Sequence, residues 1–143
     1  MTSDEKNTNS TIIPTIRYLD AAAAVDWLCE AFGFEKHLVV PGDDGDIVHA
    51  QLVFGKGMVM VGSSRDGIFD QFQAPLSSPD AKVSQSPYII VADVDKHHDR
   101  AVSVGAKVVI EPENQEHGGR LYSCRDPEGH LWNFGSYDPW ETP

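Results

Sequence analysis

The alternation of hydrophobic and polar residues predicts a strand, a helix and three further strands in the first half of the chain. Residues 11–18 are β-branched and apolar, and Pro14 among them cannot donate a ladder hydrogen bond, which predicts an edge or bulged strand. Residues 21–32 combine strong helix formers with apolar residues at helical spacing, between an N-cap candidate, Asp20, and a C-cap candidate, Gly33. The strands expected to follow lie at 34–40, 47–54 and 58–61.

The same order recurs in the second half. A strand at 88–91 and a helix at 95–104 precede three further strands, at 107–110, 119–125 and 130–134. The hairpin glycines Gly57 and Gly129 lie 129 − 57 = 72 residues apart, about half of the 143-residue chain. We therefore expect an α+β fold of two tandem βαβββ modules. The predicted segments are a disordered tail (1–10), a first module (11–63), a linker (64–85) and a second module (86–143).

The predicted linker is rich in Ser, Pro, Asp and Gln, yet it carries Ile68, Phe69 and Phe72. Structureless connections of this length are uncommon and are often functional. Two interpretations stay open: the linker packs on the surface, or it also covers a ligand site.

Charge and cysteine usage narrow the class of partner. With 22 acidic and 11 basic residues the net charge is −11, which argues against binding to nucleic acid or to an anionic membrane surface. Cys29 and Cys124 are expected to be reduced thiols. Met1–Ser10 is polar and unlike a signal peptide, and no apolar run is long enough to span a membrane, so we expect a cytoplasmic protein.

The third predicted strand offers two polar ligand-binding candidates. Alternate residues of a strand face opposite ways, so an apolar set (Val48, Ala50, Leu52 and Phe54) predicts that His49 and Gln51 face the other side. Other histidines carry weaker signals. His97 and His98 diverge on the second helix and are expected to be solvated, whereas His117 lies in a loop that reaches toward a site.

The same alternation of side-chain direction applies to the last predicted strand. Asn133 is expected on the same face as His49, while Trp132 on the opposite face is expected in the core. Tyr137 and Trp140 follow, either at the rim of the site or as a clamp on the chain end. Arg125 is expected to pair with a neighbouring acid of its hairpin, Asp126 or Glu128.

Two segments carry a family resemblance. The stretch Gly118–Trp140, and above all its core RDPEGHLWNFG at Arg125–Gly135, resembles the closing hairpin of the vicinal oxygen chelate (glyoxalase and bleomycin-resistance) superfamily. Thr15–Glu35 is similar to the opening strand and helix of that family's first module. The resemblance implies mixed sheets that curl into a cup, and it is nearest to the subgroup of bleomycin-resistance and antibiotic-binding proteins.

In the metal enzymes of this superfamily, the last strand of each module supplies a ligand four residues after the hairpin glycine. The resemblance places those positions at Val61 and Asn133, and neither residue is a carboxylate. The opening strands, 12–18 and 86–91, contain no His, Asp or Glu. The sequence thus departs from the metal-site pattern, and we expect no metal, no cofactor and no catalytic residue.

These observations favour a protein that sequesters an aromatic or amphipathic small molecule. The candidate contacts are His49, Gln51, His117, Asn133, Tyr137 and Trp140, and a homodimer is expected. A metal-dependent lyase, isomerase or dioxygenase is the first alternative. A protein-interaction module without a ligand site is the second.

Overall fold

The structure is a computed structural model that describes residues 9–141. Most of the predicted disordered tail therefore lies outside the described residues. The chain divides into two compact units: unit 1 is the chain up to Cys29 together with Gly33–Pro75, and unit 2 is Glu30–Phe32 together with Leu76 onward. The division falls inside the predicted linker, and the last residues of the first helix count with unit 2.

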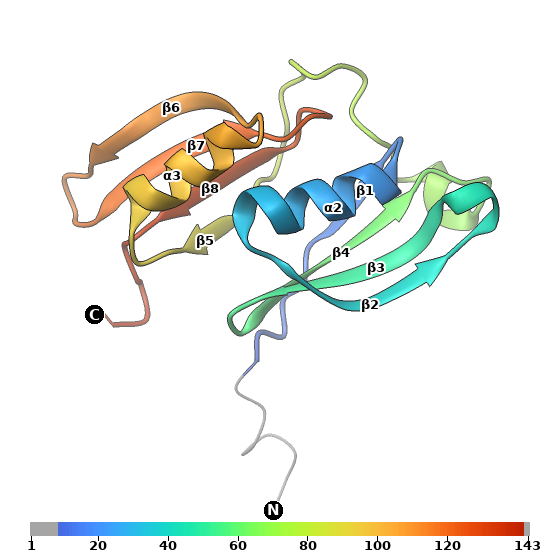
Figure 1. The fold of residues 1–143 in the computed structure, drawn as a ribbon, viewed down its shortest axis with the longest axis horizontal. Helices are drawn as coiled ribbons and strands as arrows, with labels where there is room; N and C mark the ends of the chain where they lie inside the picture. Colours follow the sequence, from blue (N-terminus) through green and yellow to red (C-terminus); the bar gives the residue numbers. More distant parts are fainter. Residues whose placement is uncertain (1–8, 142–143) are drawn as a thin grey trace, which may run out of the picture. The chain divides into compact units, whose positions relative to one another are not determined.

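Unit 1 is a four-stranded mixed sheet with one helix (Figure 1). The spatial strand order is β1-β4-β3-β2, in which β1 runs parallel to β4 and the other neighbours are antiparallel. The elements in chain order are β1 (Thr15–Tyr18), α2 (Ala21–Phe32), β2 (Glu35–Pro41), β3 (Ile47–Phe54) and β4 (Gly57–Ser63). Two short 3₁₀ helices, η1 (Asp43–Gly45) and η2 (Ile68–Gln71), follow β2 and β4.

The ends of α2 lie where the sequence predicts them. The Asp20 side chain accepts a hydrogen bond from the Ala23 N–H at 3.1 Å, which satisfies one of the unpaired donors of the first turn. Gly33 has φ 91°, a left-handed conformation that glycine adopts without a Cβ clash, and its N–H donates to the Cys29 carbonyl. Pro14 precedes β1, which is an edge strand, so the edge expectation is confirmed.

Unit 2 repeats this architecture with the order β5-β8-β7-β6. Its edge strand β5 runs parallel to β8, as β1 does to β4. The two tandem βαβββ modules and the α+β class are thus confirmed. The elements are β5 (Tyr88–Ile90), α3 (Val94–Ser103), β6 (Lys107–Asn114), β7 (Arg120–Arg125) and β8 (Leu131–Gly135).

Strand β6 is longer than the strand predicted at 107–110. It continues past Pro112 to Asn114. The register of β6 against β7 shifts between Ile110 and Glu113, so Pro112 falls in an irregular stretch of an edge strand. A proline is tolerated there because no ladder donor is needed at that point.

The core of unit 2 is an aromatic cluster that includes a histidine. Trp132 and Phe134 of β8 are fully buried, as predicted for Trp132, and both rings contact Phe32 at the end of α2. The expectation that His97 is solvated is wrong, because its ring lies 4.1 Å from the Phe134 ring centroid. His97 Nδ1 lies 2.6 Å from the Tyr122 hydroxyl, and its Nε2 lies 2.9 Å from the Phe32 carbonyl oxygen.

The structure corrects the sequence expectations for His98 and Arg125 and supports the expectation for the two cysteines. His98 is not solvated either, since its ring nitrogens contact the carboxylates of Asp99 and Glu111 and its side chain is only 17% exposed. Arg125 pairs with no acid of its hairpin; its Nη1 donates instead to three backbone carbonyls, of Pro79, Ala81 and Gly129. Cys29 and Cys124 are free thiols as expected.

The register of the two sheets corrects the expected equivalence of Val61 and Asn133. Asn133 pairs with Tyr88 of the opening strand, whereas Val61 pairs with Ile16, the counterpart of Ile89. The residue of unit 1 that matches Asn133 is therefore Met60. Between equivalent paired residues the second hairpin is one residue longer, since Ser123 and Asn133 are 133 − 123 = 10 positions apart and Gln51 and Met60 are 60 − 51 = 9 apart. Counting from the hairpin glycines missed that difference.

Candidate functional site

A cavity of about 220 Å³ opens on the sheet of unit 1. It lies over β1, β3 and β4, and the segment after β4 contributes to its wall. Its apolar surface comes from all four of these segments and is suited to flat or branched hydrocarbon groups. The apolar lining residues are Ile16, Val48, Met60, Val61 and Phe69.

The polar side chains of the cavity are led by Arg17. Its Nη1 donates to the Ser63 carbonyl oxygen at 3.2 Å, and its Cζ lies 6.0 Å from the centroid of the Phe69 ring. A guanidinium over an aromatic face is attracted to the ring electrons, so Arg17 and Phe69 support each other's position. Thr15, His49 and Gln73 complete the polar lining.

Glycine forms part of the floor beneath Arg17. Gly62 pairs with Arg17 across β1 and β4, and it is buried. A Cβ at Gly62 would lie 3.0 Å from Arg17 Nη1 and 2.9 Å from the Val48 carbonyl oxygen. The absence of a side chain here leaves room for the guanidinium.

His49 lies where the strand pattern predicts it. Ala50 and Leu52 are fully buried, while His49 and Gln51 are half-buried on the alternate positions of β3. His49 lines the cavity, and its Nε2 lies 3.2 Å from Gln51 Nε2. Gln51 is thus placed beside the site as a partner of His49.

The predicted linker contributes to the cavity wall, where one hydrogen bond ties it to the sheet and two others close its own loop. Gln73 Nε2 donates to the Thr15 carbonyl at 2.8 Å, which ties the segment after η2 to β1. Asp70 accepts hydrogen bonds from the N–H groups of Arg65 and Gly67, which close the loop that carries Phe69. These hydrogen bonds, from Arg65 above all, lower the pKa of the Asp70 carboxyl below its usual value.

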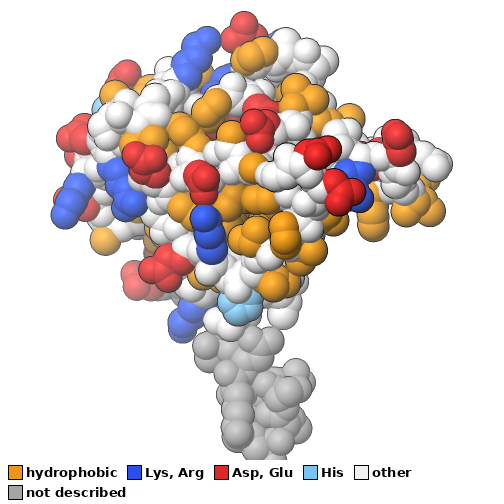
Figure 2. All heavy atoms as spheres, turned by 45° about the vertical axis from the view of Figure 1, so that its right-hand side comes forward, with side chains coloured by type: hydrophobic (Ala, Val, Ile, Leu, Met, Phe, Trp, Pro, Cys, Tyr) orange, Lys and Arg blue, Asp and Glu red, His pale blue; other side chains and the backbone are white. Residues whose placement is uncertain are grey.

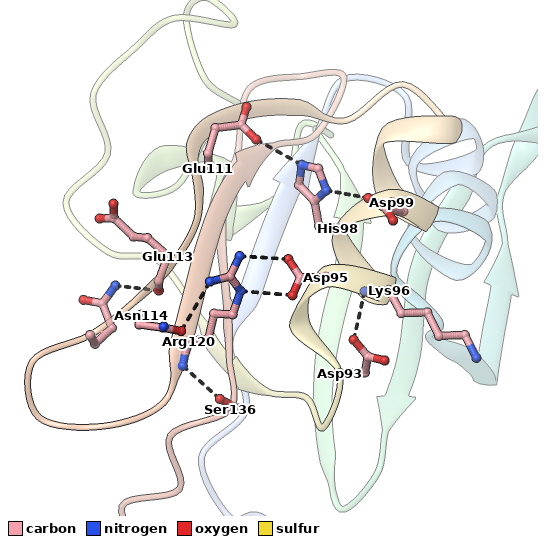
Figure 3. A network of polar contacts seen from close by, with 11 residues as sticks. Asp93, Asp95, Lys96, His98, Asp99, Glu111, Glu113, Asn114, Arg120 and Ser136 are labelled. Atoms are coloured by element: carbon pink, nitrogen blue, oxygen red, sulfur yellow. Dashed lines mark hydrogen bonds and ion pairs between the residues drawn. The ribbon is translucent and has the colours of Figure 1, made fainter.

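A second, smaller cavity of about 160 Å³ lies in unit 2 and is lined by two of the predicted residues, His117 and Tyr137. Tyr88 and Arg120 also line it. The Tyr88 hydroxyl donates to the Tyr137 carbonyl at 2.7 Å. Arg120 forms a bidentate ion pair with Asp95, in which Nε and Nη2 lie 3.0 and 3.1 Å from the two carboxylate oxygens (Figure 3).

Asn133 makes its hydrogen bonds within unit 2. Its Oδ1 accepts from the Ser123 hydroxyl at 2.7 Å, and its Nδ2 donates to the Ser86 hydroxyl and the Pro87 carbonyl. His49 and Asn133 belong to different units, so their expected common pocket stays a prediction. Trp140 is 91% exposed, and its contact with a ligand likewise stays a prediction.

Of the residues that line the unit 1 cavity, only His49 was among the predicted ligand contacts. Phe69 was named in the predicted linker, for which covering a ligand site was one of two interpretations. Arg17 was missed because the metal-site pattern concerns His, Asp and Glu. Arg17 alternates with the fully buried Tyr18, so the same strand rule that found His49 places Arg17 on the open face.

The family resemblance assigns the metal-ligand positions to Val61 and Asn133, and the register replaces Val61 by Met60, so these positions hold a thioether and an amide. Within residues 9–141, His, Cys, Asp and Glu side chains form no group of three or more that is arranged to hold a metal ion. Neither described α-helix has the length and hydrophobicity needed to cross a membrane.

Comparisons with known proteins agree with this fold. An uncharacterised protein of Mycobacterium bovis is 32% identical over 132 residues, which cover 90% of this chain and 84% of that protein. The crystal structure of TioX from Micromonospora sp. ML1 is 35% identical with a TM-score of 0.70, and covers 89% of this chain and 98% of TioX.

Lactoylglutathione lyase from Agrobacterium tumefaciens shares the fold at 19% identity and a TM-score of 0.62, with 88% of this chain and 92% of the lyase covered. The family model of the glyoxalase/bleomycin resistance protein/dioxygenase superfamily matches residues 13–134, which include both sheets except the last residue of β8. The chain therefore belongs to the glyoxalase/bleomycin resistance protein/dioxygenase superfamily.

Proposed function

We propose that this protein binds a small aromatic or amphipathic molecule in the cavity of unit 1 without a metal ion. The observation that supports the proposal is the composition of the cavity wall: apolar residues of the sheet and Phe69 surround a few polar groups, among them Arg17 and His49. Ligand pockets in proteins combine a mainly apolar wall with a small number of placed polar anchors.

The size of the cavity indicates how much of a ligand it holds. Pockets for whole drug-sized molecules have volumes of about 300–1,000 Å³. The unit 1 cavity of about 220 Å³ is smaller, so it fits one ring system of a ligand. The candidate contacts from the sequence are carried into the proposal as further contacts: Gln51 beside His49, and His117, Asn133, Tyr137 and Trp140 in unit 2.

A matched pair of phenylalanine variants tests the proposal. Phe69 lines the cavity, while Phe72 on the same segment is 82% exposed and does not line it. We expect the neutral fluorophore N-phenylnaphthylamine to bind the wild-type protein and raise its thermal midpoint, because a molecule that binds only the folded state stabilises it.

Phe69→Ala should weaken this binding about tenfold or more through loss of a ring contact, whereas Phe72→Ala should leave it unchanged. Equal affinity in all three proteins would contradict the proposed site. Elemental analysis of the purified protein tests the metal-free part of the proposal. About one tightly held divalent ion per chain would contradict it and would favour a lyase, isomerase or dioxygenase.

We also propose that the protein is a homodimer with two-fold symmetry, the commonest oligomer. The support is an opening strand, β1, that lies at the edge of its sheet with one side unpaired within unit 1. Light scattering at micromolar concentration should give twice the 15.7 kDa chain mass. A monomer mass would contradict the proposal.

A further inference from the structure

We infer that the unit 1 cavity selects an aromatic ligand that carries a negative charge, such as an aryl carboxylate, with Arg17 as the residue that determines this preference. The inference rests on the proposed function and names the chemical class of its ligand. It is drawn from the charge of the cavity wall, the position of the guanidinium and the place of His49 in that wall.

The charge of the cavity wall is opposite to that of the chain. The chain carries 22 acidic and 11 basic residues, yet none of the described residues that line this cavity is Asp or Glu. Its titratable side chains are a guanidinium, Arg17, and an imidazole, His49. Figure 2 shows acidic side chains on many parts of the visible surface, with hydrophobic side chains gathered between them. A wall that excludes carboxylates in so acidic a protein favours an anionic ligand.

The position of Arg17 suits the recognition of a carboxylate. The guanidinium lies against Gly62 and is oriented by its hydrogen bond to the Ser63 carbonyl, while the Phe69 ring lies across from it. A planar fork of N–H donors that is already oriented loses little rotational freedom when it binds a carboxylate. The adjacent Phe69 ring offers an apolar surface. The site can therefore contact the carboxylate of an aryl carboxylate with Arg17 and its aryl group with Phe69.

His49 adds a second polar group to the cavity wall. Its Nε2 lies 3.2 Å from Gln51 Nε2. An imidazole nitrogen that carries a proton donates to a carboxylate, so His49 is suited to assist Arg17 in holding an anion.

One acid lies near Arg17 and does not remove this preference. The charge of Arg17 contributes to lowering the pKa of Asp70, but Asp70 does not line the cavity. Its carboxylate already accepts hydrogen bonds from the Arg65 and Gly67 N–H groups and from the Ser64 hydroxyl. Asp70 therefore serves to close the loop rather than to occupy the cavity.

Three naphthalene derivatives of nearly equal shape test the inference by calorimetric titration: naphthoate, naphthamide and naphthylmethylammonium. At pH 7 and low salt we expect naphthoate to bind at least tenfold more tightly than naphthamide, and the ammonium compound to bind most weakly. Arg17→Met should lower the affinity for naphthoate about tenfold to a hundredfold, as for loss of a charge-assisted hydrogen bond, and lower the affinity for naphthamide much less, so that the preference between the two compounds is lost.

Lys56→Met is the matched control, because it removes one positive charge from an exposed turn of the same unit, outside the cavity. It should change naphthoate binding by less than about twofold, as for a screened surface charge. Far-UV circular dichroism and the thermal midpoint establish that each variant is folded.

The outcomes separate the inference from the proposed function. Equal binding of naphthoate and naphthamide, both weakened by Phe69→Ala, would overturn the anion preference and leave the aromatic binder standing. No binding of any of the three compounds, or binding that Phe69→Ala does not affect, would overturn both. A loss of naphthoate binding in Lys56→Met as large as in Arg17→Met would also overturn the role of Arg17.

Discussion

The two units build the same sheet, and they use its opening strand differently. Register places Ile90 of unit 2 opposite Gly135, where unit 1 has Arg17 opposite Gly62. In unit 2 the glycine is covered by the Tyr88 ring, since a Cβ at Gly135 would lie 2.6 Å from the Tyr88 hydroxyl. In unit 1 the matching glycine is covered by a guanidinium that borders a cavity.

A second pair of equivalent residues, Asn133 of unit 2 and Met60 of unit 1, also differs between the two sheets. Asn133 is held by Ser123, Ser86 and the backbone, so its amide is already hydrogen-bonded on both sides. The matching residue in unit 1 is Met60, which adds an apolar and adaptable wall to the cavity. Equivalent positions of the two units thus hold an amide bound by neighbouring groups in unit 2 and a thioether that lines a cavity in unit 1.

The largest difference should appear in the core of unit 2. Trp132→Ala removes a fully buried ring that contacts Phe32 and donates its Nε1–H to Asp126 at 3.1 Å. We expect the free energy of unfolding to fall by about 3–5 kcal/mol, as for other buried aromatics, measured by urea denaturation. Trp140→Ala, at a 91% exposed site, should change it by less than about 0.5 kcal/mol. Similar costs for the two variants would show that the aromatic cluster is not the main source of stability in unit 2.

A smaller effect should follow from the histidine in that cluster. Burial lowers the pKa of His97 below its ordinary value of 6.5. The unfolded chain therefore binds more protons than the folded chain as the pH falls below about 6.5. The contribution of neutral His97 to the free energy of unfolding is complete above that pH and is lost as the pH decreases. Protonation would also oppose the acceptor role of Nδ1 toward the Tyr122 hydroxyl.

Urea denaturation at pH 7 and pH 5 measures this loss, and the His97→Gln variant should show a smaller loss than the wild type. His37→Gln, at an exposed position of β2, is the control, and it should retain the wild-type loss. If His97→Gln and the wild type lost equal stability between the two pH values, the histidine would not be a determinant of acid sensitivity.

The smallest effect is expected on the open face of unit 1. His49→Ala removes a half-buried side chain whose ring hydrogen bond is to Gln51, outside the core formed by Ala50 and Leu52. The free energy of unfolding should change by at most about 1 kcal/mol in the same urea experiment. A cost as large as that of Trp132→Ala would mean that β3 presents His49 to the core, and the assignment of the open face would be wrong.

The sequence predicts local features well where one residue decides them. Asp20 and Gly33 mark the ends of α2, and alternation in β3 separates the buried Ala50 and Leu52 from His49. Long-range features are harder to predict. His97 looks like a surface residue on a helix, because its burial depends on Phe134 and Tyr122, which are distant in the sequence.

The candidate site was predicted only in part for the same reason. His49 was found by alternation, but the contribution of Phe69 depends on how the segment after β4 folds back onto β1. The expected equivalence of Val61 and Asn133 is wrong because the two hairpins differ in length by one residue. That difference shifts every equivalent position after the hairpin. No periodicity in the sequence reports that difference.

The helix α2 has a consequence for any attempt to divide the protein. Most of α2 is counted with unit 1, but its last residues, Glu30–Phe32, are counted with unit 2, where Phe32 contacts Trp132 and Phe134. A fragment that begins at Leu76 would keep every strand of its sheet and still lack a ring from the middle of its hydrophobic core. Truncation of the gene at the linker is therefore expected to yield a half that is prone to aggregate, because part of its core is encoded before the linker.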